Sequence, residues 1–154
     1  MFTKDFKYPQ VFRASLAIDQ ELPGGITATL EGIYTKTLND IIYQNVNSDP
    51  TVDFNWTGTP DNRPVYTRTS LDPTYDAIYL GSNTNEGNTY NISATLAKDF
   101  DFGLSTYVAY TYGDATSLME GTSSQNSSQW RGIFNVDGRN APMVGRSDFS
   151  IGSR

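Results

Sequence analysis

Few side chains in this chain are suited to catalysis. The 154 residues contain no histidine and no cysteine, so the commonest general base, the commonest zinc ligand and any thiol nucleophile are missing. A Ser-His-Asp triad is therefore impossible, and no Gly-x-Ser-x-Gly motif occurs. A pair of carboxylates could still hydrolyse a glycosidic bond, but no pair stands out. We expect no enzyme, no metal centre and no cofactor.

Two kinds of short motif have simpler explanations than chemistry. Asp101-Phe102-Gly103 matches the metal-binding triplet of protein kinases. No Gly-rich loop or catalytic loop accompanies it, and Asp and Gly are ordinary turn formers. The pattern Asn-x-Ser/Thr begins at Asn55, Asn91 and Asn126. Such triplets arise by chance in chains rich in these residues, so we treat them as incidental.

The candidates for ligand contact lie in long polar stretches. Rings and guanidinium groups on exterior loops often contact ligands, and this chain has six residues of interest there: Trp56, Asn62, Arg63, Trp130, Arg131 and Arg139. The sequence favours the alternative that the loops pack on each other, with tryptophan as the anchor. Asp49 with Asp53, or Asp72 with Asp76, could hold calcium with loop carbonyls. The EF-hand pattern is absent, so we expect solvated loops.

A two-residue alternation of apolar and polar side chains organises the rest of the chain. This period is typical of β-strands, because successive side chains leave opposite faces of the pleat. It predicts strands at 11–22, 26–37, 89–98 and 102–112, with turns at Pro23-Gly24-Gly25 and 98–103. Residues 41–43 prolong the second strand or form a separate piece, and 75–80 is a candidate short strand. A fifth strand starts near Arg146, with Phe149 and Ile151 on one face. No helix is predicted.

Composition narrows the class of protein. The net charge is −6, which argues against a nucleic-acid partner, because phosphate binding needs a basic surface. The hydrophobic content of 37% is low for a chain that must bury a generous core. No run of about 18 apolar residues is present, so no transmembrane helix is predicted. The segment 1–9 lacks the apolar region of a signal peptide, and we expect a mature or internal piece of an exported protein.

The spacing of turns and loops favours a membrane barrel. Loops longer than about 12–15 residues are uncommon in compact soluble domains, yet the stretches 45–73 and 113–145 are both longer. Outer-membrane β-barrels alternate short periplasmic turns with long extracellular loops. We therefore predict an all-β fold, an antiparallel meander of about five strands. It would form a segment of a large transmembrane β-barrel with long extracellular loops.

The predicted outward positions carry two groups of aromatic residues. Those near the loops are Phe12, Tyr34, Tyr90, Tyr110 and Tyr112, and those near the turns are Phe100 and Phe102, with Leu22. Rings with an apolar body and a polar tip are stable at both membrane interfaces. Smaller apolar residues lie between the two groups, and the inward positions are mostly Ser, Thr, Asn and small residues. A soluble sheet with one face on a core predicts the same alternation.

Several segments of the chain resemble one family. Phe6-Lys7-Tyr8-Pro9-Gln10-Val11-Phe12-Arg13, Leu30-Glu31-Gly32-Ile33-Tyr34-Thr35-Lys36 and Gly58-Thr59-Pro60-Asp61-Asn62-Arg63-Pro64 are similar to TonB-dependent outer-membrane receptors. Within that family, the segments resemble the Oar-like branch. The segments 80–87, 123–130 and 145–149 add to the resemblance, which covers nearly the whole chain.

The resemblance implies a barrel of about 22 strands, closed around a plug and energised from the inner membrane. Residues 1–154 would be a partial barrel domain, without plug, TonB-contacting segment or closing strand. Its implied partners are outer-membrane lipid, the remainder of the parent barrel and plug, and a TonB-type energising protein acting through the parent. The implied location is the outer membrane of a Gram-negative bacterium.

Two functions of different classes follow. The first is part of the wall of a TonB-dependent receptor that takes up a nutrient or oligomeric ligand. The alternative is a secreted soluble β-sandwich that binds glycan or protein. A carboxylate-based hydrolase is the weakest of the hypotheses.

Overall fold

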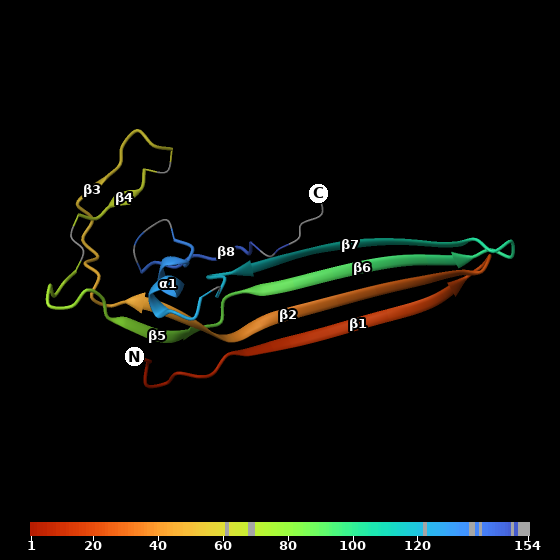
Figure 1. Cartoon of the computed structure of the whole chain (residues 1–154), viewed down its shortest axis with the longest axis horizontal. Coiled ribbons are helices and arrows are strands. Elements are labelled where there is room, and N and C mark those ends of the chain that lie inside the picture. The colour runs from red at the N-terminus through yellow and green to blue at the C-terminus, as the bar shows by residue number, and fades with distance from the viewer. Residues whose placement is uncertain are drawn as a thin grey trace. The chain divides into compact units, whose positions relative to one another are not determined.

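The computed structural model describes residues 1–60, 62–67, 70–121, 123–135, 138, 140–148 and 150. The chain is all-β, with strand over 51% and helix over 4%, which confirms the predicted class and the antiparallel sheet. Its elements in chain order are β1 Gln10–Leu22, β2 Ile26–Asn45, β3 Phe54–Asn55, β4 Pro64–Val65, β5 Tyr79–Thr84, β6 Asn88–Asp99, β7 Ser105–Ser117, α1 Asn126–Arg131 and β8 Gly145–Arg146 (Figure 1).

The chain divides into two compact units. The strand unit comprises Val11–Thr37, Gly87–Thr116 and Arg146–Arg154, and the loop unit comprises Met1–Gln10, Leu38–Glu86 and Ser117–Gly145. The 20-residue strand β2 contributes its first part to one unit and its last part to the other.

The strand unit is an open sheet in the order β1-β2-β6-β7, extended by β8. Long strands run side by side and are joined at one end by two short turns (Figure 1). β2 pairs with β6 from Ile26↔Lys98 to Lys36↔Asn88, and β6 continues to β7 up to Asp99↔Ser105. Residues of the same parity therefore share one face across these strands. The predicted hairpins and their alternation are confirmed.

Glycines make the two short turns possible. Gly24 and Gly25 have φ of 88° and 69°, and Gly103 has φ of 91°. Side chains with a Cβ rarely adopt this left-handed conformation, so a residue without one is favoured at each position. The backbone amide of Phe100 donates to the carbonyl of Leu104 at 2.8 Å and closes the second turn.

The loop unit contains a smaller pairing of strands. β5 lies antiparallel to the end of β2, from Asp40↔Thr84 to Asn45↔Tyr79. The first residues of the chain bridge to β5 in parallel at Phe2↔Gly81. A Cβ on Gly81 would stand 2.6 Å from the Phe2 ring, so this glycine makes room for the aromatic side chain.

Buried asparagines hold the loop unit together. Asn47 is 4% exposed, and its side-chain amide donates to the carbonyls of Asp72 and Tyr75 at 3.0 and 2.7 Å. Its side-chain oxygen accepts from the Asp72 amide at 2.9 Å. The Asn140 side chain bonds both the amide and the carbonyl of Asn45, at 3.1 and 2.9 Å. Buried polar groups need such partners, and here they come from segments far apart in sequence.

Several predicted boundaries were wrong. The stretch 45–73 is not structureless, because β3 and β4 form a short hairpin within it, Phe54↔Val65. The candidate strand at 75–80 instead spans 79–84, and the six-residue helix α1 was not predicted. The prolongation of the second strand over residues 41–43 is confirmed. The fifth strand begins as β8 at Gly145–Arg146, while Phe149 and Ile151 lie outside the described residues.

Candidate functional site: the apolar face of the sheet

The even-numbered residues of the strand unit form one apolar face. The register places Leu30 opposite Ala94, Ala28 opposite Leu96, and Gly32 opposite Ile92. β7 adds the residues that pair with this row of β6, namely Val108, Tyr110 and Tyr112. On β1 the same parity carries Phe12, Ala14, Leu16 and Ile18. The face is therefore apolar across all four long strands.

No protein covers this apolar face in the described part of the chain. Leu16 is 70% exposed, Val108 66% and Leu30 52%. The buried hydrophobic residues among those described are Ile42 and Leu118, and both belong to the loop unit. Exposed apolar surface of this extent usually marks contact with a membrane or another protein.

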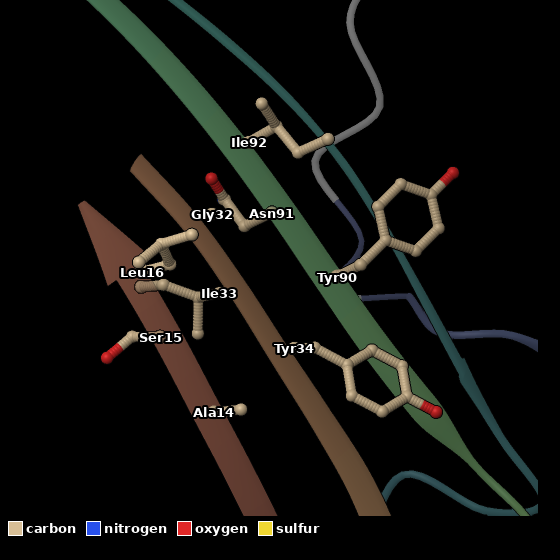
Figure 2. A pocket seen from close by; sticks show the side chains of 9 residues that line it. All are labelled: Ala14, Ser15, Leu16, Gly32, Ile33, Tyr34, Tyr90, Asn91 and Ile92. Carbon is tan, nitrogen blue, oxygen red and sulfur yellow. The ribbon is translucent and has the colours of Figure 1, made fainter. Parts of the chain in front are cut away.

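Tyrosines gather toward the end of this face that leads into the loops. Tyr34 stands opposite Tyr90 across β2 and β6, and both rings border a hollow that Figure 2 shows from close by. The rings of Tyr90 and Tyr112 are 6.0 Å apart. Tyr110 pairs with Ala94 and thus lies further toward the middle of the strands. Phe12, on β1, is 53% exposed.

Phenylalanines occupy the opposite end, at the turn between β6 and β7. The rings of Phe100 and Phe102 are 5.3 Å apart, and Phe102 is 77% exposed. The ammonium of Lys98 lies 4.6 Å from the centre of the Phe100 ring, a favourable cation–π distance. The structure thus places aromatic residues at both ends of the apolar face.

The charges differ between the two faces of the sheet. The even face carries Lys98 at the turn end and Lys36 at the other end, opposite Ile26 and Asn88 respectively. The odd face carries Arg13 and the acidic residues Asp19, Glu21, Glu31 and Asp99. The apolar face therefore has a lysine at each end and a carboxylate only at Asp114, whereas the polar face is net negative.

Side chains on the polar face bond across strands. The Arg13 guanidinium donates to the Thr35 hydroxyl at 3.1 Å, and the Thr29 hydroxyl donates to Asp19 at 2.6 Å. These pairs join β1 to β2 on the side away from the apolar face. Such contacts are stable where water reaches the surface, and they stabilise the pairing of the two strands only modestly.

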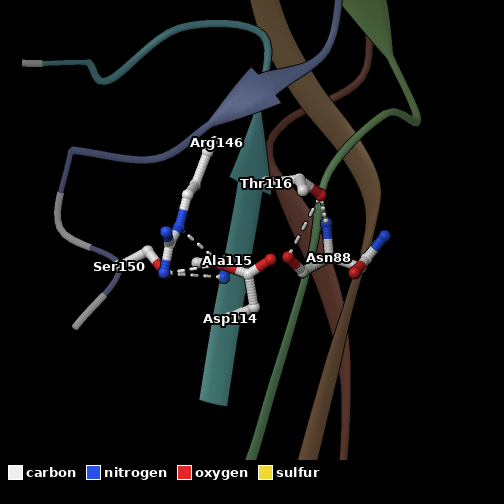
Figure 3. A network of polar contacts seen from close by, with 6 residues as sticks. All are labelled: Asn88, Asp114, Ala115, Thr116, Arg146 and Ser150. Carbon is white, nitrogen blue, oxygen red and sulfur yellow. Dashed lines mark hydrogen bonds and ion pairs between the residues drawn. The ribbon is translucent and has the colours of Figure 1, made fainter. Parts of the chain in front are cut away.

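A polar cluster surrounds Asp114 (Figure 3), which pairs with Tyr90 one row of side chains beyond Tyr112. Asp114 accepts from Arg146 Nε at 2.9 Å and from the Ser150 hydroxyl at 2.7 Å. The Ser147 amide also donates to the Ala115 carbonyl at 2.9 Å. The cluster ties the chain after β8 to the end of β7.

The loop candidates fall on two local elements. Trp56, Asn62 and Arg63 lie on or beside the β3–β4 hairpin, where the Trp56 amide donates to the Arg63 carbonyl at 2.9 Å. Asn62 has φ of 43°. Trp56 is 57% exposed, so its ring is available to a ligand.

Trp130 and Arg131 both lie on α1. The Trp130 indole donates to Asn140 at 3.0 Å, and its ring lies 5.9 Å from that of Tyr79. Trp130 therefore packs the loop unit, whereas Arg131 is exposed. Arg139 lies outside the described residues.

Sequence reasoning missed the asparagines of the loop core, which carry no periodic signal. Among the described residues, no group of three or more acidic side chains is arranged to hold a metal. Asp72 instead accepts from the Thr74 amide at 2.8 Å, which lowers the pKa of its carboxyl. Among all the residues that the structure describes, no helix has the length and apolarity that a membrane span requires.

No family model, curated protein or solved structure matches the chain.

Proposed function

We propose that this chain is part of the wall of an outer-membrane β-barrel. In this proposal it belongs to a TonB-dependent receptor of the Oar-like kind, which takes up a nutrient or oligomeric ligand. The observation that carries the proposal is the single-layered sheet of β1, β2, β6 and β7, whose apolar face no other described segment covers. A lipid bilayer would cover that face, and water would reach the polar one.

The dimensions of the sheet support lipid contact. The segment Ile26–Lys36 of β2 runs from the row of Lys98 to the row of Lys36. At about 3.3 Å per residue it spans roughly 33 Å along the strand. At a tilt near 40°, this corresponds to about 25 Å across the membrane, which is the height of the apolar band of such barrels. Lysines at the two ends would reach the head groups on either side.

The proposal requires partner strands at both edges of the sheet. Within the described residues, β1 pairs only with β2, and β8 covers only the loop-side end of β7. Unpaired backbone groups are not stable in lipid. The proposal therefore includes further strands of a parent barrel at both edges, a plug, and a TonB-type protein that energises the parent. In this proposal, the turns at Gly24 and Gly103 face the periplasm, and the loop unit is extracellular.

Paramagnetic lipid labels test the proposal. The chain is prepared in zwitterionic micelles that contain a lipid with a spin label in its acyl chain. The label should broaden the NMR signals of Leu30, Ile92 and Leu96, while Thr29 and Thr95 on the other face keep theirs. These residues alternate along the same strands, so tumbling and expression affect both groups equally.

The soluble alternative predicts the opposite outcome. A secreted β-sandwich that binds glycan or protein would stay monodisperse without detergent and melt cooperatively. Its Leu30 and Ile92 methyl groups would show no lipid-label broadening, because protein would cover them. That result would contradict the membrane-wall proposal and favour a binding module.

A further inference from the structure

The apolar face has a hollow at its loop-side end. The hollow has a volume of about 350 Å³ and lies over Gly32, between Leu16 of β1 and Ile92 of β6 (Figure 2). Apart from Gly32 and its two chain neighbours, no described residue has a heavy atom within 4 Å of the place where a Cβ on Gly32 would be. Together with the small side chain of Ala14, this glycine leaves open a space that a larger residue would fill.

The walls of this hollow determine what can occupy it. Leu16 and Ile92 supply hydrocarbon at the sides, and the rings of Tyr34 and Tyr90 border one end. An occupant that removes these side chains from water must itself be apolar, because burial of a polar group without a partner is unfavourable. Ser15 and Asn91 also line the hollow, but they belong to the odd-numbered rows, so the tyrosine hydroxyls are the polar side-chain groups of the even face there.

A positive charge lies next to that end. Lys36 follows Tyr34 by two residues, shares its face, and stands opposite Asn88. No ion pair to Lys36 is present within the described part of the chain. Asp114, the nearest carboxylate on this face by register, is already paired with Arg146 at 2.9 Å. A cation without an ion pair therefore stands one row of side chains beyond the Tyr34 end of the hollow.

We propose that the hollow is a site for an anionic lipid. One acyl chain lies over Gly32 between Leu16 and Ile92, and the phosphate of the head group lies at Lys36 and the tyrosine hydroxyls. The apolar walls and the single cation at one end match the two halves of such an amphiphile. This inference rests on the proposed membrane location and adds a preferred lipid position and charge to it.

Two substitutions separate the halves of the site, and each has a matched control on the same face. Gly32→Phe fills the hollow, whereas Ala28→Phe adds the same ring to the same strand two rows of side chains away. Lys36→Gln removes the cation beside the hollow, whereas Lys98→Gln removes the cation at the opposite end. The chain is titrated in phosphatidylcholine micelles with phosphatidylglycerol, and the chemical shifts of the Tyr34 and Tyr90 rings are followed.

The expected result is saturable binding of phosphatidylglycerol at the tyrosine rings. Lys36→Gln should weaken it about fivefold, the effect of one basic residue near an anionic lipid. Gly32→Phe should abolish it, and both controls should bind as the original chain does. The inference is overturned if phosphatidylcholine alone gives the same shifts, or if Gly32→Phe and Ala28→Phe behave alike.

Failure of the membrane proposal would look different. Both proposals are contradicted if the tyrosine rings respond to neither lipid and the Leu30 methyl shows no lipid-label broadening. A chain that enters the micelle and shows no preference for the anionic lipid contradicts this inference alone.

Discussion

The two units of this chain are held together in opposite ways. The loop unit buries Asn45, Asn47, Ser48 and Asp49 with Ile42 and Leu118, so hydrogen bonds carry much of its cohesion. The strand unit has ladders of backbone pairs and, in its described part, no buried hydrophobic residue. A sheet in water normally gains stability by burying one face. The loop unit therefore buries a core of its own, whereas the described strand unit leaves its apolar face uncovered.

The largest expected effect is a loss of stability after substitution on the apolar face of the strand unit. Leu30→Arg places a charge in the middle of the proposed lipid band and should reduce stability in lipid by about 2–4 kcal/mol. Glu31→Arg, the adjacent residue on the polar face, is the control and should have little effect. Urea titration of the chain in phosphatidylcholine vesicles measures both. Equal losses for the two variants would show that the faces do not differ in environment.

The next effect concerns the loop unit alone. Asn47→Ala removes three hydrogen bonds of a buried side chain and should destabilise the unit by about 2–3 kcal/mol, because the partners lose their bonds. Hydrogen exchange at the Asp72 amide should accelerate, while exchange in β6 stays unchanged. Asn39→Ala, which loses one exposed bond to Gln10, is the milder control. Faster exchange in both units would mean that they unfold together.

Glycine substitutions compare close packing within the two units. A Cβ on Gly113 would stand 2.6 Å from the backbone oxygen of Tyr90, so Gly113→Ala should disturb the β6–β7 pairing and cost about 1–3 kcal/mol. In Gly81→Ala the contact is with the Phe2 ring, which can move, so the loss should be smaller. Gly32→Ala meets no neighbour and should be neutral. Thermal unfolding in micelles ranks the three variants, and a larger loss for Gly32→Ala would contradict this order.

The smallest effect is a dependence on acid. The pKa of the Asp72 carboxyl lies below its ordinary value, first because the Thr74 amide donates to it. A lowered pKa in the folded state stabilises the fold above the ordinary Asp value of about 3.9. This contribution disappears as the pH falls through the depressed pKa.

Carboxyl carbon NMR titration would follow Asp72. Asp72→Asn should remove the acid sensitivity of the turn from Asp72 to Tyr75 and leave the strand unit unchanged. An Asp72 that titrates at or above its ordinary value would contradict the hydrogen bond from the Thr74 amide.

Sequence alone predicted the strand unit better than the loop unit. The alternation of Leu16, Ile18, Leu30 and Ile92 defines a face without knowledge of any neighbour, because the period is local. The hollow over Gly32 could not be foreseen, since it depends on which residues of β1 and β6 lie on either side. The resemblance to outer-membrane receptors rests on segments of sequence and stays a prediction.

The misses in the loop unit have physical causes. α1 has only six residues, with Trp130 as its one large apolar side chain, so no helical periodicity appears. β5 is set by its pairing with Asp40–Asn45, which the sequence of 79–84 does not reveal. Asparagine is a turn former by propensity, and nothing local distinguishes Asn47, which is buried, from Asn62, which is exposed.

The register of the sheet also sets the order in which it can assemble. β1 with β2, and β6 with β7, are neighbours in sequence across tight turns, and hairpins of this kind form within about 1–10 μs. The pairing of β2 with β6 joins Lys36 to Asn88 and must first close the long intervening segment, which costs chain entropy. That segment lies within the loop unit, whose asparagine bonds bring its distant parts together. Formation of the loop unit would therefore reduce this entropy cost. Two hairpins that had each formed separately could then pair in the correct register.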